Sequence, residues 1–300
     1  MKTGFCFVVN NKITTEPLWS SFFKNVDENS YGVYIHAKEP KQFQSQIHYN
    51  IVPQHIETKW GTPSLTSASI EVMKHALEDE CDQLILLPYD AVPLHDYHTL
   101  TGMIKNKNIF CTYPFLKEPQ LRVLKTRYNR LSETFKCKIT DNMFIKQNMF
   151  FTINSSTANQ IVDHYVFENI FLQPNTNMLG QFVTDELYFV NMCQYYNIPF
   201  QKIPNYIICT SNFTDNIVDN KVTPHLAHTL HNGISGICIG SSPIEDKVNQ
   251  DDVYVKIIDT PSNFSAKQIP SDSIFCRKVT RLTDQALNYL EDVYAAGCCA

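Results

Sequence analysis

Short, almost wholly apolar segments alternate with amphipathic segments along the first third of the chain. The apolar segments Phe5–Val9, Tyr31–His36 and Leu84–Leu87 are typical of strands that are buried on both faces of a parallel sheet. The amphipathic segments predict a short helix over 17–23 and a longer helix with Thr62 as its N-cap and a proline at its first position. This alternation predicts an α/β fold: a Rossmann-like, mostly parallel central sheet covered by helices on both faces.

The later part of the chain mixes the two patterns. A strand is predicted over Met149–Ile153, and Ser155 and Ser156 are expected to cap the helix that follows. Thr184 is expected to cap another helix whose first turn is acidic, and a last helix is predicted to begin at Thr283.

Composition and length allow one folded unit with an ordinary core. The chain has 300 residues, of which 43% are apolar, and no repeat or linker divides it. We therefore expect a single domain over 1–295 and a disordered tail over 296–300. The 25 Lys and Arg against 30 Asp and Glu give a net charge of −5, which argues against a nucleic-acid or anionic-membrane binder.

The pattern also predicts where the protein works. No stretch approaches the roughly 18 consecutive apolar residues of a membrane span, and the short apolar run at the N-terminus indicates a strand rather than a signal peptide. The ten cysteines are scattered and form no CxxC pair, which suits a reducing compartment. We therefore expect a cytoplasmic protein without a membrane span.

The familiar motifs for phosphate, metal and nucleophile chemistry are absent. There is no GxxxxGKS/T, GxGxxG, GxSxG or HExxH motif, and no Asp-x-Asp follows a strand. His225, His228 and His231 have a regular spacing, but no carboxylate or cysteine completes a metal motif, so exposed or structural histidines are the simpler interpretation. The sequence predicts neither a metal nor a cofactor.

Five segments resemble, in order, blocks of the core-2/I-branching glycosyltransferase family, which includes the peptide O-xylosyltransferases. They are WGTPSL (60–65), LILLPYDAVPLHDYHTL (84–100), KQNMFFTI (146–153), TDEL (184–187) and SIFCRKV (273–279). Each block alone is weakly specific, whereas five in order are much more so. The resemblance implies a GT-A-type fold and an inverting transfer from a nucleotide sugar that needs no divalent metal.

An inverting transfer needs a base for the acceptor hydroxyl and positive charge near the leaving diphosphate. By its place in the TDEL block, Glu186 is expected to be the base, with Asp185 capping or orienting it. Arg277 and Lys278 are expected to bind the diphosphate in place of a metal. Each has a structural alternative: acidic residues stabilise the first turn of a helix without any catalytic role, and a basic pair before a helix can be simply solvated.

Further polar residues lie where ligands of open α/β sheets bind, at the carboxyl ends of strands and beside them. The residues expected to line the nucleotide-sugar pocket are Asn10, His36, Lys38, Trp60 and Asp90. On the acceptor side we expect Asn148 and Asp185.

The resemblance favours UDP-GlcNAc or UDP-xylose as donor, with UDP-glucose also allowed, and a glycan or glycoprotein acceptor. A chain without an evident anchor resembles a compact catalytic domain of a bacterium or a large virus. Two positions depart from the family pattern: Ala91 and Asn148 stand where many or some members have an acid. A non-catalytic nucleotide-sugar- or glycan-binding relative is therefore an alternative, and an interaction or structural protein is a third.

Overall fold

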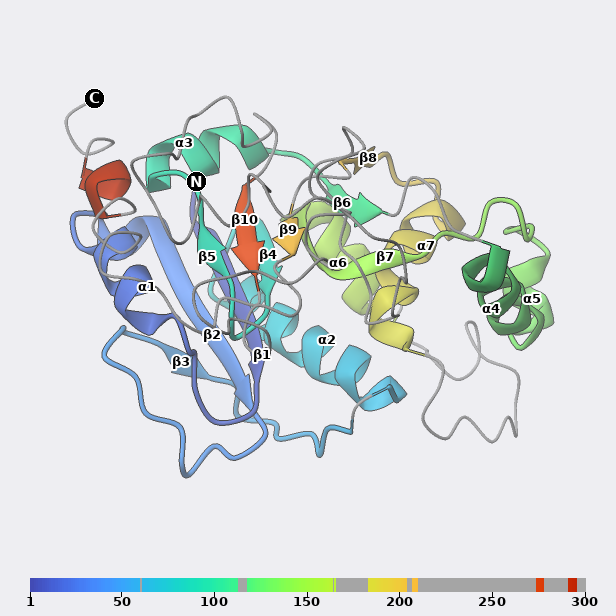
Figure 1. Cartoon of the computed structure of the whole chain (residues 1–300), viewed down its shortest axis with the longest axis horizontal. Helices are drawn as coiled ribbons and strands as arrows, with labels where there is room; N and C mark the ends of the chain where they lie inside the picture. Colours follow the sequence, from blue (N-terminus) through green and yellow to red (C-terminus); the bar gives the residue numbers. More distant parts are fainter. Residues whose placement is uncertain are drawn as a thin grey trace, which may run out of the picture.

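The computed structural model describes residues 1–59, 61–112, 118–163, 165, 183–203, 207–209, 274–277 and 291–295. Within these ranges the main sheet has seven strands in the order β3-β2-β1-β4-β7-β6-β8 (Figure 1). Their bounds are β1 Thr3–Val9, β2 Tyr31–Ala37, β3 Asn50–Ile51, β4 Gln83–Leu87, β6 Ile109–Thr112, β7 Gln147–Asn154 and β8 Gln201–Lys202. Strand β7 is antiparallel to both of its neighbours, and the other pairings are parallel. The mostly parallel sheet is as predicted.

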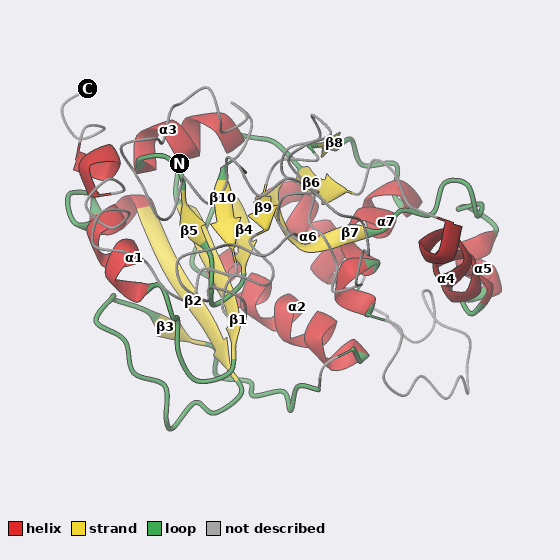
Figure 2. Ribbon diagram, viewed as in Figure 1, coloured by secondary structure: helices red, strands yellow, loops and turns green. Residues whose placement is uncertain are grey.

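Helices lie on both sides of this sheet (Figure 2). The α-helices with described bounds are α1 Glu16–Phe23, α2 Pro63–Glu78, α3 Tyr97–Ile104, α4 Glu118–Asn129, α5 Glu133–Lys136, α6 Ser155–Asp163 and α7 Tyr188–Tyr195. Residues 291–295 are also helical, within the predicted last helix, whose expected start lies outside the described residues. No helix among the described residues is long and apolar enough to cross a bilayer.

Alternate residues of the central strands belong to two separate cores. In β1, Phe5 and Phe7 pack with α1 and α3, whereas Cys6 packs with α2 on the opposite face. Strand β4 repeats the pattern, with Ile85 in the first core and Leu84 in the second. This arrangement explains why the strands read as continuous apolar runs: each face of the sheet must be apolar when helices cover both.

A small second sheet lies at the turn that follows β4. Strand β10 (Phe275–Arg277) pairs antiparallel with β5 (Val92–Pro93) and parallel with β9 (Ile207–Cys209). The amide of Leu94 donates to the carbonyl of Ile274 at 2.9 Å and extends this contact. The second and fifth sequence blocks are thereby brought together, although about 180 residues separate them.

Helix α1 holds the same turn from the other side. The hydroxyl of Thr15 and the indole N–H of Trp19 both donate to the carbonyl of Ala91, at 2.6 and 2.9 Å. Ala91 itself is fully buried in the first core. The position where many family members have an acid is therefore a packing position here, and an unpaired carboxylate in it would be costly.

Three predicted helix caps differ in the structure. Thr62 is at the N-cap position of α2, but its hydroxyl donates to the carbonyl of Lys59 at 2.8 Å instead of capping the helix. Helix α6 is capped by Asn154, whose Oδ1 accepts from the amide of Thr157, and not by the serines. Thr184 begins a 3₁₀ turn, Thr184–Glu186, and α7 starts only at Tyr188. Only for Thr184 does a contact between distant elements replace the cap; for the other two helices the alternative partner lies three residues away.

Candidate active site

The reversed direction of β7 brings its beginning to the carboxyl ends of the parallel strands. Leu86, near the end of β4, pairs with Phe151, and β7 begins four residues earlier at Gln147. Strands β1 and β2 end at the same edge as β4 because all three are parallel. The predicted residues that follow β1, β2 and β4 (Asn10, Lys38 and Asp90) and Asn148 at the start of β7 therefore belong to a single edge of the sheet, where ligands of open α/β sheets bind.

The 3₁₀ turn Thr184–Glu186 is fastened to the first turns of α2. The hydroxyl oxygens of Thr184 and Thr66 are 2.9 Å apart, and Thr184 also donates to the carbonyl of Thr62 at 3.3 Å. Both threonine side chains are fully buried. This contact joins the first and fourth sequence blocks and explains why Thr184 is not a helix cap: its hydroxyl is used between elements.

Asp185 is a buried carboxyl group with an unusual proton affinity. It is only 3% exposed, and its Oδ1 has no hydrogen-bond partner among the described residues. Burial, and secondarily the negative charge of Glu186, raise the pKa of Asp185 from 3.8 to about 7. The backbone is held by Gln147, whose side chain donates to the Asp185 carbonyl at 3.4 Å and accepts from the amide of Val190 at 2.6 Å.

Glu186 forms an ion pair with Lys146, the residue that precedes β7. Nζ of Lys146 lies 2.9 Å from Oε2 of Glu186, and the two side chains are 20% and 19% exposed. Glu186 is thus more accessible than Asp185, while its position is defined by a cation. The expected location in the first turn of an α-helix was wrong, because a three-residue 3₁₀ turn precedes α7.

Arg127, from α4, adds a second cation to this group. Burial lowers the pKa of its guanidinium, and the negative charges of Glu186 and Asp185 oppose that effect. Its Nε is buried and has no hydrogen-bond partner among the described residues. Two carboxyl groups from one turn and two cations from two other segments therefore interact electrostatically at this place.

Asn148 lies in β7, two residues after Lys146. It is 2% exposed, and its amide nitrogen Nδ2 has no partner among the described residues. No hydrogen bond among the described residues joins it to Asp185 or Glu186. It supplies a buried donor at the beginning of β7, without proton-accepting capacity.

On the donor side, Asn10 and Lys38 lie next to each other beyond the ends of β1 and β2. The amide of Lys38 donates to the carbonyl of Val9, and the amide of Glu39 donates to that of Asn10, both at 3.0 Å. Both predicted residues are exposed. Asp90, in the turn after β4, is 3% exposed.

His36 has a structural place at the end of β2. Its Nε2 accepts from the amide of Ile56 at 3.0 Å, and its ring stacks on His55 with centroids 5.5 Å apart. Burial, and then His55, lower the pKa of His36, so the neutral ring is favoured. His36 thereby holds the segment that leads to the first sequence block, and the side chain is 2% exposed.

Of the two expected diphosphate-binding residues, the structure describes Arg277 and not Lys278. Arg277 is the last residue of β10, whose neighbour Cys276 pairs with Val92, two residues after Asp90. Lys278 and Trp60 lie outside the described residues, as do the three regularly spaced histidines.

Comparison with known proteins agrees with this architecture. The sequence profile of the Core-2/I-Branching enzyme family matches residues 3–230. This chain belongs to the core-2/I-branching enzyme family. Over 104 residues it is also 23% identical to glycosyltransferase BC10 of Oryza sativa subsp. japonica, a match that covers 32% of this chain and 26% of the rice protein. The match thus spans about a quarter of that relative's length.

For this core-2/I-branching family member, the fold prediction is confirmed. A mixed, mostly parallel sheet of seven strands among the described residues, with helices on both faces, is consistent with the GT-A fold of the family. Sequence reasoning missed Lys146 and Arg127. Lys146 is the first residue of the KQNMFFTI block and could have been noted there, whereas nothing in the sequence around Arg127 points to the site.

Proposed function

We propose that this protein is an inverting glycosyltransferase that moves a sugar from a UDP-sugar to a hydroxyl group of a glycan or glycoprotein without a divalent metal. The resemblance favours GlcNAc or xylose as the transferred sugar, and glucose is also allowed. Family membership supports the reaction class. The single observation that carries the mechanism is the pair of adjacent carboxyl groups, Asp185 and Glu186, at the edge of the sheet where ligands bind.

The two carboxyl groups differ in a way that suits one base. Asp185 is buried and has the raised pKa, so it is the member of the pair that holds a proton near neutral pH. Glu186 is more exposed and is paired with a cation. A carboxyl group that is accessible and held in position by a cation suits general-base catalysis. We therefore assign the base role to Glu186 and a positioning role to Asp185.

The proposed step is a single displacement. Glu186 accepts the proton of the acceptor hydroxyl as that oxygen forms a bond to the anomeric carbon of the sugar. The bond from the anomeric carbon to the UDP oxygen breaks on the opposite face, and its electron pair leaves with the diphosphate. Lys146 occupies Oε2 of Glu186, which leaves Oε1 for the incoming hydroxyl.

Positive charge at the departing diphosphate would come from Arg277 and Lys278. The pairing of β10 with β5 supports this assignment, because it places the Arg277 backbone beside the turn that contains Asp90. Asn10 and Lys38, side by side beyond β1 and β2, would border the nucleotide. Trp60 and the segment held by His36 would close the same pocket.

The alternative is a non-catalytic relative that binds nucleotide sugars or glycans. The burial of Ala91 in the core and the amide of Asn148 favour it, since both remove an acid from the site. Incubation of the purified protein with UDP-GlcNAc, UDP-xylose and UDP-glucose, with release of UDP measured, separates the two. Release by the wild-type protein that Glu186→Gln abolishes supports transfer, whereas thermal stabilisation by UDP without any turnover supports binding alone.

A further inference from the structure

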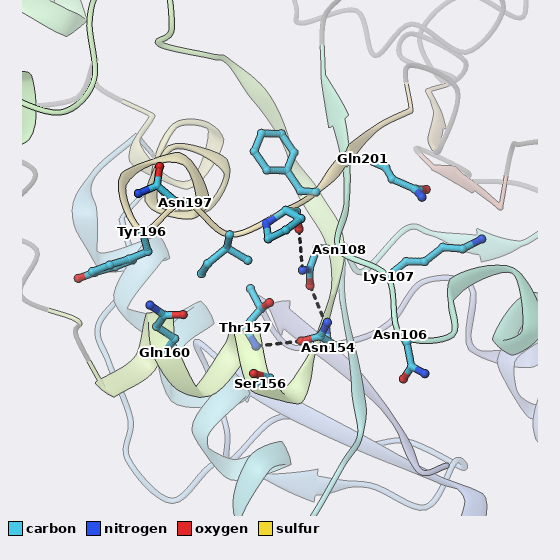
Figure 3. A pocket seen from close by; sticks show the side chains of 13 residues that line it. Asn106, Lys107, Asn108, Asn154, Ser156, Thr157, Gln160, Tyr196, Asn197 and Gln201 are labelled. Atoms are coloured by element: carbon cyan, nitrogen blue, oxygen red, sulfur yellow. Dashed lines mark hydrogen bonds between the residues drawn. The ribbon is translucent and has the colours of Figure 1, made fainter.

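A second cavity lies at the opposite edge of the sheet from the candidate active site. It has a volume of about 620 Å³ and is lined by 106–108, by four residues of the β7–α6 segment (Asn154, Ser156, Thr157 and Gln160) and by 196–201 (Figure 3). Gln83, the first residue of β4, pairs with Asn154 at the end of β7, and β6 begins nearby at Ile109. The cavity is therefore at the amino ends of the parallel strands, with the sheet between it and the carboxyl pair.

The cavity is polar but almost without charge. Amide and hydroxyl side chains make up most of its lining, and no Asp or Glu is among its lining residues, all of which are described. The one cation, Lys107, donates to the carbonyl of Met103 at 2.8 Å at the end of α3. A cation would find no carboxylate here, and an anion such as a phosphate would find a single lysine, which already donates to a backbone carbonyl.

Hydrogen bonds fix the innermost amides in place. Nδ2 of Asn108 donates to the carbonyl of Pro199 at 2.9 Å, and its Oδ1 accepts from the backbone amide of Asn154 at 3.0 Å. Oδ1 of Asn154 in turn accepts from the amide of Thr157 at 2.9 Å. The side-chain amide of Asn154 and the backbone of Thr157 are therefore held in fixed positions before any ligand arrives, which lowers the entropic cost of binding.

Gln160 is a lining residue whose side chain is available to contact a ligand. Gln160 is half-buried in α6 and has no hydrogen-bond partner among the described residues. Figure 3 shows it close to Tyr196, with Asn108 and Asn154 on the other side of the cavity. Asn106 and Asn197 have φ of 56°, a left-handed conformation that asparagine tolerates, so their presence is explained by the backbone.

We propose that this cavity is a second carbohydrate-binding site, for a neutral saccharide. A side-chain amide offers a donor and an acceptor in one plane, which matches two neighbouring hydroxyl groups of a sugar. Tyr196, which is among the lining residues, has an aromatic ring of the kind that packs against the C–H groups of a sugar. The volume is within the usual range of small-molecule sites, about 300–1,000 Å³. This assignment does not depend on the proposed transfer reaction. Such a site would bind part of a glycan chain away from the reacting centre.

Ligand-observed saturation-transfer NMR on the full chain tests the proposal, with cellobiose, N,N′-diacetylchitobiose and xylobiose as millimolar probes and saturating UDP to occupy the donor site. We expect saturation transfer to at least one probe, and an affinity about fivefold lower in Gln160→Ala, for the loss of one hydrogen bond. Tyr196→Leu, which keeps apolar volume but removes the ring face, should weaken binding as well. Alanine is a good helix former, so Gln160→Ala keeps α6 intact.

Matched controls make the outcome decisive. Asn159→Ala removes an exposed amide from the same helix, one residue away and outside the cavity, and should leave binding unchanged. Glu186→Gln should also leave it unchanged, so loss of transfer activity and loss of saccharide binding are distinguishable. The proposal is overturned if no probe receives saturation transfer, or if neither Gln160→Ala nor Tyr196→Leu reduces the saturation-transfer signal. It is also overturned if Glu186→Gln abolishes that signal, or if a short uncharged peptide displaces the probes.

Discussion

Lys146 and Glu186 come from segments forty residues apart and form an ion pair with Nζ 2.9 Å from Oε2. The lysine precedes β7, and the glutamate ends the 3₁₀ turn that is fastened to α2. The pair therefore links the central sheet to the turn that contains both carboxyl groups. Its presence means that the proposed base has a defined position before any substrate binds.

Glu186→Gln should lower the rate of sugar transfer by roughly 10²–10⁴-fold, because glutamine keeps the shape of the side chain but cannot accept a proton. UDP affinity should be unchanged, since the carboxylate faces the acceptor. Steady-state rates and UDP titration measure the two effects. Glu133→Gln is the matched control, since Glu133 is paired with Lys136 at 2.9 Å but is 79% exposed on α5. A Glu186→Gln enzyme with near wild-type turnover would remove this residue from the mechanism, and Asp90 would be tested next.

Lys146→Met should reduce turnover about tenfold through loss of the defined position of Glu186, whereas Lys146→Arg should retain most of it. Stability should change by no more than about 1 kcal/mol, because the pair is partly exposed. The pH profile of turnover gives a readout that a purely structural lysine would not move: removal of the cation should shift the acidic limb of the profile to higher pH, because the base must lose its proton to act. Equal losses in the Met and Arg variants, without such a shift, would contradict a positioning role.

Asp185→Asn should change how stability depends on pH. The pKa of Asp185 is raised to about 7 in the folded protein, above its unfolded value, so the unfolded state binds fewer protons between about pH 4 and 7. Stability of the wild-type protein should therefore fall as pH rises through this window, as far as this group is concerned. Asparagine carries no proton to lose, so the variant should gain stability relative to wild type between pH 5 and pH 8. Urea unfolding of both proteins at the two pH values measures the difference. If the free energy of unfolding changes equally with pH in both proteins, the raised pKa of a buried Asp185 is contradicted.

Arg277→Ala and Lys278→Ala should weaken UDP binding about tenfold or more each, as expected for a charged hydrogen bond. Uridine affinity should fall much less, because uridine has no diphosphate. Calorimetric titration of both ligands tests this, with the exposed Lys105→Ala as the control. Equal losses for UDP and uridine would show that the two residues act through folding.

EDTA should leave UDP binding and transfer unchanged, since the positive charge at the diphosphate is proposed to come from side chains. The measurement is turnover before and after chelation, followed by addition of Mn²⁺. Loss of activity with EDTA and its recovery with Mn²⁺ would indicate a metal site, with Asp90 as the first residue to examine.

Much of the fold could be predicted because helices on both faces of a sheet impose a visible pattern. Strands β1, β2 and β4 were located within two residues, and the start of α2 was correct. The caps were less predictable. Thr184 and Thr62 have the residue type of a cap, but their hydroxyl groups are used for contacts with Thr66 and Lys59 that no local sequence rule anticipates.

The sequence by itself determined the first strands and the helices between them, the family and the identity of the acidic pair, because apolar periodicity and short blocks are local properties of the chain. Only the tertiary structure decided which charged residues lie near that pair. Lys146 reaches Glu186 because β7 runs against its neighbours and begins at the edge where they end. Arg127 of α4 interacts electrostatically with both acids, and Asp185 has its raised pKa because the fold buries it. Burial and proximity between distant segments follow from packing, which no local pattern specifies.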